Sequence, residues 1–90
     1  MLKKIAFIAA ATAVSTAALA GPQCPAYPDN ERIPQDKFQQ QLKDQGYSIQ
    51  KFKVTSGNCY EIYGRDKQGQ KVEIYFDAKT GQPVKTKTEK

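Results

Sequence analysis

The stretch GNCYEIYGRDKQGQKVEIYFD, residues 57–77, decides the fold. Apolar and polar residues alternate on both sides of Asp66–Gly69, which has the composition of a three-residue hairpin loop with Gly69 in the left-handed region. Such a loop places Asp66 opposite Gln70. A slip of one residue would mix the two faces of both strands, so the alternation itself predicts the register.

Counting outward from this loop gives the hairpin two faces. The predicted core face pairs Gly64 with Val72, Ile62 with Ile74, and Tyr60 with Phe76. The opposite side carries Cys59, Asp77 and six residues that we call the open face: Glu61, Tyr63, Arg65, Lys71, Glu73 and Tyr75. Tyr63 and Tyr75 are expected to be exposed there among charged neighbours.

Residues 34–45 (PQDKFQQQLKDQ) predict a helix ahead of the hairpin. Pro34 suits the first helical position, where its missing N–H costs nothing. Gly46 suits a left-handed cap at the other end. Phe38 and Leu42 form the apolar stripe, and a stripe of two residues needs an apolar sheet to lie on.

Residues 47–55 (YSIQKFKVT) predict a strand whose parity changes. Tyr47 and Ile49 share one face, whereas Phe52 and Val54 share the other. A bulge near residues 50–51 would bring all four to one side. Alternatively, Tyr47 belongs to the helix exit and Ile49 faces outward.

The elements together predict an α+β fold: one N-terminal helix packed on a three- to four-stranded antiparallel β-sheet. Asp77–Gly81 reads as a turn, Val84 suggests a short last strand, and Pro83 confines that strand to an edge. Residues 34–86 form the predicted domain and residues 87–90 a frayed tail. The predicted core consists of Phe38, Leu42, Phe52, Val54, Tyr60, Ile62, Val72, Ile74 and Phe76.

Residues 1–20 have the pattern of a secretory signal peptide: a charged start, an apolar run and the small-residue exit Ala18–Ala20. The apolar run is short for a retained membrane anchor, which is the alternative. Cleavage after Ala20 would leave a periplasmic or secreted chain without a stable membrane anchor. Residues 21–33 then form an extended arm that carries Cys24. The residues before Cys24 lack the small neighbour that a lipid-attachment signal needs.

Two cysteines, Cys24 and Cys59, remain after such cleavage. An even count in an oxidising compartment predicts a disulfide. The alternative, a redox-active pair, usually has the spacing Cys-x-x-Cys. A bridge that closes 36 residues contributes roughly 4 kcal/mol in the chain-entropy model, a large share of the stability of so small a domain.

Charge and composition argue against several classes of function. Without Lys3 and Lys4, the 14 basic residues become 12 against 9 acidic ones, a net charge of about +3. The basic residues are scattered, so no nucleic-acid partner is predicted. The chain has no histidine and no phosphate-binding loop, and we expect neither cofactor nor metal. Asp66 and Asp77 lack the run of oxygen ligands that a calcium loop needs.

Glu61 and Glu73 are the best candidates for a catalytic pair. They are diagonal neighbours in the predicted register, roughly 7–8 Å apart at Cα, and glycosidases use carboxylates at comparable separations. That chemistry also needs a cleft that desolvates one acid, and a bare sheet face has no second wall. A docking surface built around Tyr63 and Tyr75 and an ordinary solvated sheet face are the two readings that remain open. An exposed sheet edge offers a second docking route.

The order of these signals resembles the PepSY domain family, in particular its short exported members. The resemblance runs from about Pro34 to Val84. It includes Tyr60-Glu61-Ile62, the loop at residues 66–69, Lys71-Val72-Glu73-Ile74-Tyr75, and the closing turn D-x-x-T-G at residues 77–81. It implies a helix packed on an antiparallel sheet and no catalytic residues. Gln82-Pro83 interrupts the usual final strand, which puts docking through that edge in doubt.

The resemblance implies a function as well. PepSY domains occur in propeptides of secreted metallopeptidases, where they are thought to inhibit the enzyme. We therefore expect a non-catalytic periplasmic module that binds another envelope protein, with a peptidase inhibited in trans as one candidate. The alternatives are an envelope protein that binds a small ligand or metal ion, and a small hydrolase that uses Glu61 and Glu73.

Overall fold

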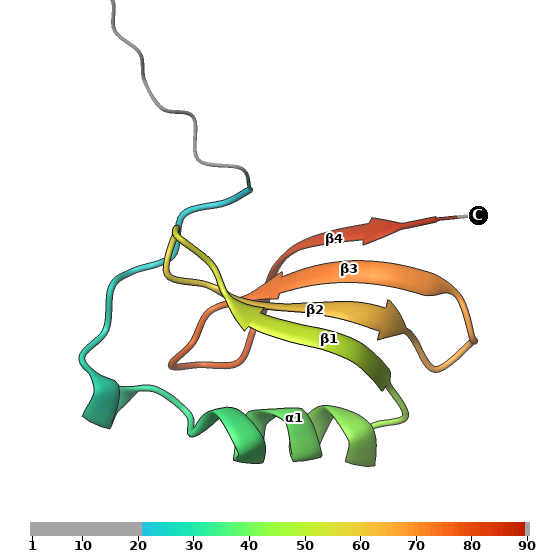
Figure 1. Ribbon diagram of the computed structural model, residues 1–90, viewed down its shortest axis with the longest axis horizontal. Coiled ribbons are helices and arrows are strands. Elements are labelled where there is room, and N and C mark those ends of the chain that lie inside the picture. Colours follow the sequence, from blue (N-terminus) through green and yellow to red (C-terminus); the bar gives the residue numbers. More distant parts are fainter. Residues whose placement is uncertain (1–20, 90) are drawn as a thin grey trace, which may run out of the picture.

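The computed structural model describes residues 21–89. A single 3-10 turn, Asp29–Glu31, precedes helix α1, Gln35–Asp44, and four strands follow. They are β1 (Ser48–Val54), β2 (Tyr60–Arg65), β3 (Lys71–Phe76) and β4 (Pro83–Thr88). Figure 1 shows α1 on one side of the sheet and the start of the arm on the other. The predicted signal peptide lies outside the described residues.

Helix α1 lies in the middle of the chain rather than at its N-terminus, which corrects that part of the predicted fold. Pro34 occupies the N-cap position and not the first helical position, so the helix begins one residue later than predicted, at Gln35. At the other end Gly46 has φ +103°. Its N–H donates to the carbonyl oxygen of Lys43, and the N–H of Tyr47 donates to that of Leu42, both at 3.0 Å. This Schellman pattern satisfies the last helical carbonyls and turns the chain into β1.

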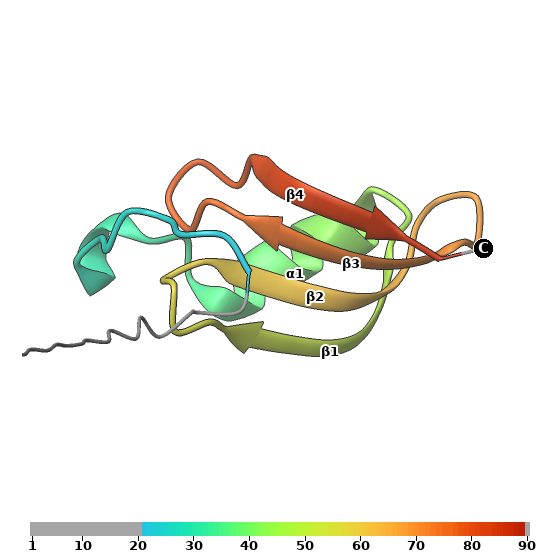
Figure 2. The same ribbon diagram turned by 90° about the horizontal axis from the view of Figure 1, so that it is seen from above.

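The four strands form one antiparallel sheet in the order β1-β2-β3-β4 (Figure 2). The pairs Gly64–Val72, Ile62–Ile74 and Tyr60–Phe76 confirm the predicted hairpin register. In the loop, the N–H of Asp66 donates to the carbonyl oxygen of Gln70 at 2.9 Å, and Gly69 has φ +82°. Alternation and loop chemistry were therefore sufficient to define this hairpin.

Strand β1 contains the predicted bulge. Ile49 pairs with Gly64 and Lys51 with Tyr63, so Gln50 is the extra residue. The bulge brings Ile49 against the core, so the alternative was wrong in having it face outward. The other part of that alternative is confirmed, because Tyr47 precedes β1 and belongs to the helix exit. Glycine is required at position 64, beside the bulge, because a Cβ there would overlap the carbonyl oxygen of Ser48.

The core lies between α1 and the sheet. Phe38 is 2% exposed, and its ring centroid lies 4.9 Å from that of Phe76 and 5.1 Å from that of Tyr60. The cluster contains seven of the nine predicted residues and Ala78. Phe52 is only partly buried. Val54 is 37% exposed, and its assignment to the core was wrong, because it ends an edge strand beyond the reach of α1.

Strand β4 is longer than predicted. Pro83 is its first residue, a position where a missing N–H is tolerated. The strand pairs with β3 as far as Thr88, so the tail predicted from Lys87 began two residues too early. Gln82-Pro83 therefore does not prevent a final strand, and β4 forms one edge of the sheet.

Candidate functional site

The N-terminal arm covers part of the open face. The predicted disulfide between Cys24 and Cys59 is present, with Cα atoms 5.1 Å apart. The N–H of Cys24 also donates to the carbonyl oxygen of Gly57 at 2.7 Å. Tyr75 joins both cysteines in a buried cluster and is 7% exposed. The prediction of an exposed Tyr63–Tyr75 pair was therefore wrong for Tyr75, because the arm shields its ring.

The six predicted open-face residues separate into two groups. Arg65 and Lys71 are exposed at the hairpin end, where the Nη1 of Arg65 donates to the carbonyl oxygen of Gly69 at 2.9 Å. The other four line a groove of about 490 Å³ beside the arm. Its lining residues are Gly21, Lys53, Val54, Thr55, Ser56, Glu61, Tyr63, Glu73, Tyr75, Lys85 and Lys87.

Lysines from both edge strands surround the two carboxyl groups in this groove. The Nζ of Lys53 lies 3.9 Å from Oε1 of Glu61, and the Nζ of Lys87 lies 3.7 Å from Oε1 of Glu73. Lys85 pairs with Tyr75 across β3 and β4. Sequence reasoning missed these lysines, because their placement depends on the registers of β1 and β4.

Glu61 is the unusual member of the site. It is 2% exposed, and its Oε2 has no hydrogen-bond partner among the described residues. Nearby, the Tyr75 hydroxyl donates to Oε2 of Glu73 at 2.8 Å. A buried carboxylate oxygen without a donor is costly. Either a proton held on this carboxyl or an added cation would satisfy it.

The pKa values of the pair move in opposite directions. Burial is the main cause that raises the pKa of Glu61, and hydrogen bonding with Glu73 raises it further. Hydrogen bonding with the Glu61 carboxyl is the main cause that lowers the pKa of Glu73 to about 2. The two carboxylates raise the pKa of Tyr63 to about 12, and Glu73 is the main cause that raises that of Tyr75. The pair thus favours one negative charge, on Glu73, with the proton on Glu61.

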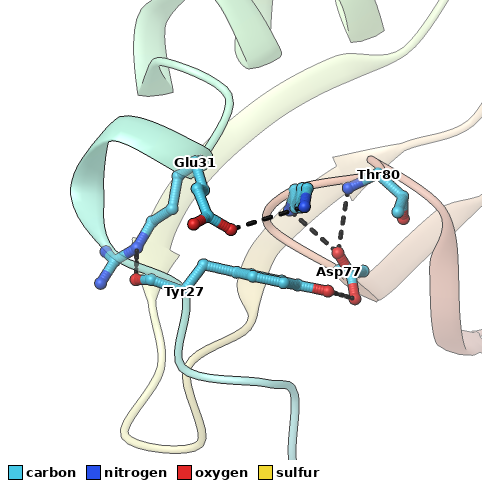
Figure 3. Close-up of polar contacts among 6 residues, drawn as sticks. Tyr27, Glu31, Asp77 and Thr80 are labelled. Atoms are coloured by element: carbon cyan, nitrogen blue, oxygen red, sulfur yellow. Dashed lines mark hydrogen bonds and ion pairs between the residues drawn. The ribbon is translucent and has the colours of Figure 1, made fainter.

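A second polar cluster joins the arm to the D-x-x-T-G turn (Figure 3). The Tyr27 hydroxyl donates to Oδ2 of Asp77 at 2.9 Å, and the N–H groups of Lys79 and Thr80 donate to Oδ1 at 2.9 Å. Burial alone would raise the pKa of Asp77, but these hydrogen bonds outweigh it and lower the pKa. The Nζ of Lys79 also lies 3.4 Å from Oε1 of Glu31. Asp77 therefore anchors the arm.

The turns that contain Asp66 and Asp77 do not bring together the ligands of a metal site. Within residues 21–89, no group of three or more cysteine, aspartate or glutamate side chains is placed to hold a metal ion. In the same range, no helix is long and apolar enough to cross a membrane. The polar groups that line the described groove are carboxyl, phenol, ammonium and aliphatic hydroxyl groups.

One signal in the sequence could have predicted the position of the arm. The hairpin register places Cys59 on the side of the open face, whereas Cys24 belongs to the arm. A disulfide between them requires the arm to cross that side of the sheet. The burial of Tyr75 follows from this crossing, since Tyr75 lies next to Cys59 and Cys24.

These features define a small disulfide-bonded α+β domain with one helix on a four-stranded antiparallel sheet and an arm folded over the opposite face. The PepSY family model described as peptidase propeptide and YPEB domain matches residues 4–87, so the chain belongs to this family. Comparisons with curated proteins and with solved structures give no match. Domains of this family are generally non-catalytic propeptide or regulatory modules related to peptidase inhibition. They usually occur in secreted or extracellular proteins, and a disulfide fits an oxidising compartment.

Proposed function

We propose that this chain is an exported, non-catalytic module that binds another extracytoplasmic protein, and that the partner is a peptidase regulated in trans. The predicted signal peptide would direct export and be removed by cleavage after Ala20. Membership of the PepSY family and the buried disulfide support the compartment and the partner class. The observation that carries the proposal is the exposed edge of β4.

All six residues of β4 are exposed, unlike those of β2 and β3. The N–H of Glu89 donates to the carbonyl oxygen of Lys71 at 2.9 Å, so these two form a hydrogen-bonded pair. Because hydrogen-bonded and non-hydrogen-bonded pairs alternate in an antiparallel ladder, the backbone groups of Thr86 and Thr88 point away from β3. An extended segment of a partner can pair with these free groups as a fifth strand.

The hydrolase alternative gains one observation and meets one obstacle. A protonated Glu61 beside an ionised Glu73 has the pKa separation of an acid–base pair, and the arm supplies the wall that a bare sheet lacks. However, Glu61 is 2% exposed, and Lys87 lies beside Glu73. A substrate bond could reach the Glu61 carboxyl only after the groups around it moved. We therefore favour binding over catalysis.

A small-ligand function is the second candidate, because the groove volume of about 490 Å³ falls within the usual range for small-molecule sites. Its charged lining favours a zwitterionic or polar ligand rather than an apolar one. Thermal-shift screening separates the two candidates. A ligand that stabilises the wild type but not a Tyr63→Ala variant would favour the groove.

The edge-docking proposal is tested with a photo-crosslinking residue at Thr86 and a matched residue at Gln40, which is exposed on α1. Each protein is exposed to the native extracytoplasmic fraction, and the adducts are identified by mass spectrometry. We expect a saturable adduct with a peptidase at position 86 only, together with a loss of that peptidase's activity on titration. Equal labelling from both positions, or an adduct whose activity is unaffected, would contradict peptidase regulation through this edge.

A further inference from the structure

Gly21, the first described residue, lies at the mouth of the groove that contains Glu61 and Glu73. A Cβ built on Gly21 would lie 2.9 Å from Cε2 and 3.0 Å from the hydroxyl oxygen of Tyr75. The same hydroxyl donates to Glu73 at 2.8 Å. The backbone of Gly21 therefore lies beside Tyr75, whose hydroxyl contacts Glu73, at a place where a side chain would strike the tyrosine ring.

The groove has an acceptor that none of the described groups satisfies. Oε2 of Glu61 is buried and unpaired, while Oε1 has Lys53 at 3.9 Å. The charged and titratable groups that face it are Tyr63 on β2, Glu73 and Tyr75 on β3, and the lysines of the two edge strands, Lys53, Lys85 and Lys87. The arm itself contributes no charged side chain to the groove.

We propose that hydrolysis of the Ala20–Gly21 peptide bond places the new α-ammonium group of Gly21 in this groove, where it binds the Glu61–Glu73 carboxyl pair. Water adds across the amide bond, Ala20 leaves with the new carboxylate, and the amine of Gly21 takes up a proton. The site is completed by processing and binds the chain's own N-terminus. The inference rests on the export and cleavage that the proposed function includes.

This arrangement explains why glycine occupies position 21 and why a carboxyl group is buried at position 61. The ammonium supplies the cation that Glu61 lacks, so both carboxyl groups can ionise in the processed protein. It also adds a charged tie between the arm and β2–β3 beside the disulfide. In the unprocessed chain, the amide nitrogen of Gly21 carries no charge, and Glu61 keeps its proton instead.

Proton linkage determines how the stability that the ammonium group contributes depends on pH. An ammonium group that gains carboxylate partners has a pKa above the ordinary α-amine range of about 7.7–8.0. Its contribution to stability is complete below that range and is lost as pH rises through the raised folded-state pKa. Blocking the amine should therefore lower the unfolding temperature at neutral pH and have little effect at alkaline pH.

The test begins with the precursor secreted from cells and processed there, whose intact mass must correspond to a chain that starts at Gly21. The protein is labelled with 13C-glycine, and the Cα signal of Gly21, the only one of six glycines that would carry an α-amine, is followed through the neutral and alkaline range. We expect titration above the ordinary α-amine range in the wild type and in Glu31→Gln, the control at the far end of the arm. We expect a smaller rise of the α-amine pKa in Glu61→Gln, because only Glu73 remains there as a partner.

Three results would overturn the inference: a different first residue, an ordinary α-amine pKa in the wild type, or the same raised pKa in Glu61→Gln. If Glu61→Gln does not fold, the wild type acetylated at its N-terminus decides instead. An unfolding temperature unchanged by acetylation at neutral pH would then contradict the ammonium site. Capture through Thr86 does not involve the groove, so its success or failure is independent of these results.

Discussion

Removal of the disulfide, by Cys24→Ala together with Cys59→Ala, should cost a large share of the stability of this domain. The bridge joins residues 35 positions apart. The chain-entropy model assigns about 4 kcal/mol to a loop of this length. A domain of this size is stable by roughly 4–10 kcal/mol. The other ties of the arm, such as the Tyr27–Asp77 hydrogen bond at 2.9 Å, contribute about 1 kcal/mol each.

Urea denaturation followed by circular dichroism measures this loss directly. We expect the midpoint to fall by an amount that corresponds to about 4 kcal/mol. The same double variant should leave Tyr75 accessible, because the arm would no longer be fixed over its ring. A loss below about 1 kcal/mol would refute the reasoning, since it would mean that the remaining contacts hold the arm without the bridge.

Three further predictions follow from individual contacts. Tyr27→Phe should cost about 1 kcal/mol in urea unfolding, because it removes only the hydroxyl that binds Asp77; an unchanged midpoint would show that this contact does not secure the arm. Glu73, whose pKa is lowered to about 2, stabilises the fold above its unfolded value near 4.5. The stability difference between wild type and Glu73→Gln should therefore shrink as pH falls from 4.5 towards 2, and a difference that stays constant across this window would contradict the assignment. Gly64→Ala should unfold well below the wild-type temperature, because its methyl group would overlap the backbone of Ser48, whereas Gly69→Ala has open space and only its positive φ to overcome.

The sequence predicted the β2–β3 hairpin in detail because its information is local. The alternation of residues 60–76 fixes which side each residue faces, and Asp66–Gly69 fixes the loop. The bulge in β1 was also readable, since a change of parity in one strand has few solutions. The helix end was predictable because Gly46 marks a left-handed cap.

The site was less predictable because it depends on contacts between distant segments. The Tyr75 side chain ends in a hydroxyl group and faces away from α1, so the sequence pattern indicates an exposed residue. It is buried because it packs against the disulfide that holds the arm. The prediction that Val54 belongs to the core was wrong for the opposite reason. Val54 is on the predicted side of the sheet, but it lies at the end of an edge strand and stays exposed. The alternation of apolar and polar residues predicts which face of the sheet a residue is on, but it does not predict whether another segment covers that residue.

The edge of β4 carries the functional proposal, and Thr86→Pro tests it most directly. Proline removes the outward N–H of Thr86 without taking a hydrogen bond from the β3–β4 ladder, while Thr86→Ala keeps that N–H and serves as the matched control. The measurement is the affinity of each folded variant for the peptidase captured at this edge. The account predicts wild-type affinity for Thr86→Ala and a loss of at least tenfold, about 1.4 kcal/mol, for Thr86→Pro. Equal affinity for both variants would contradict docking by strand addition.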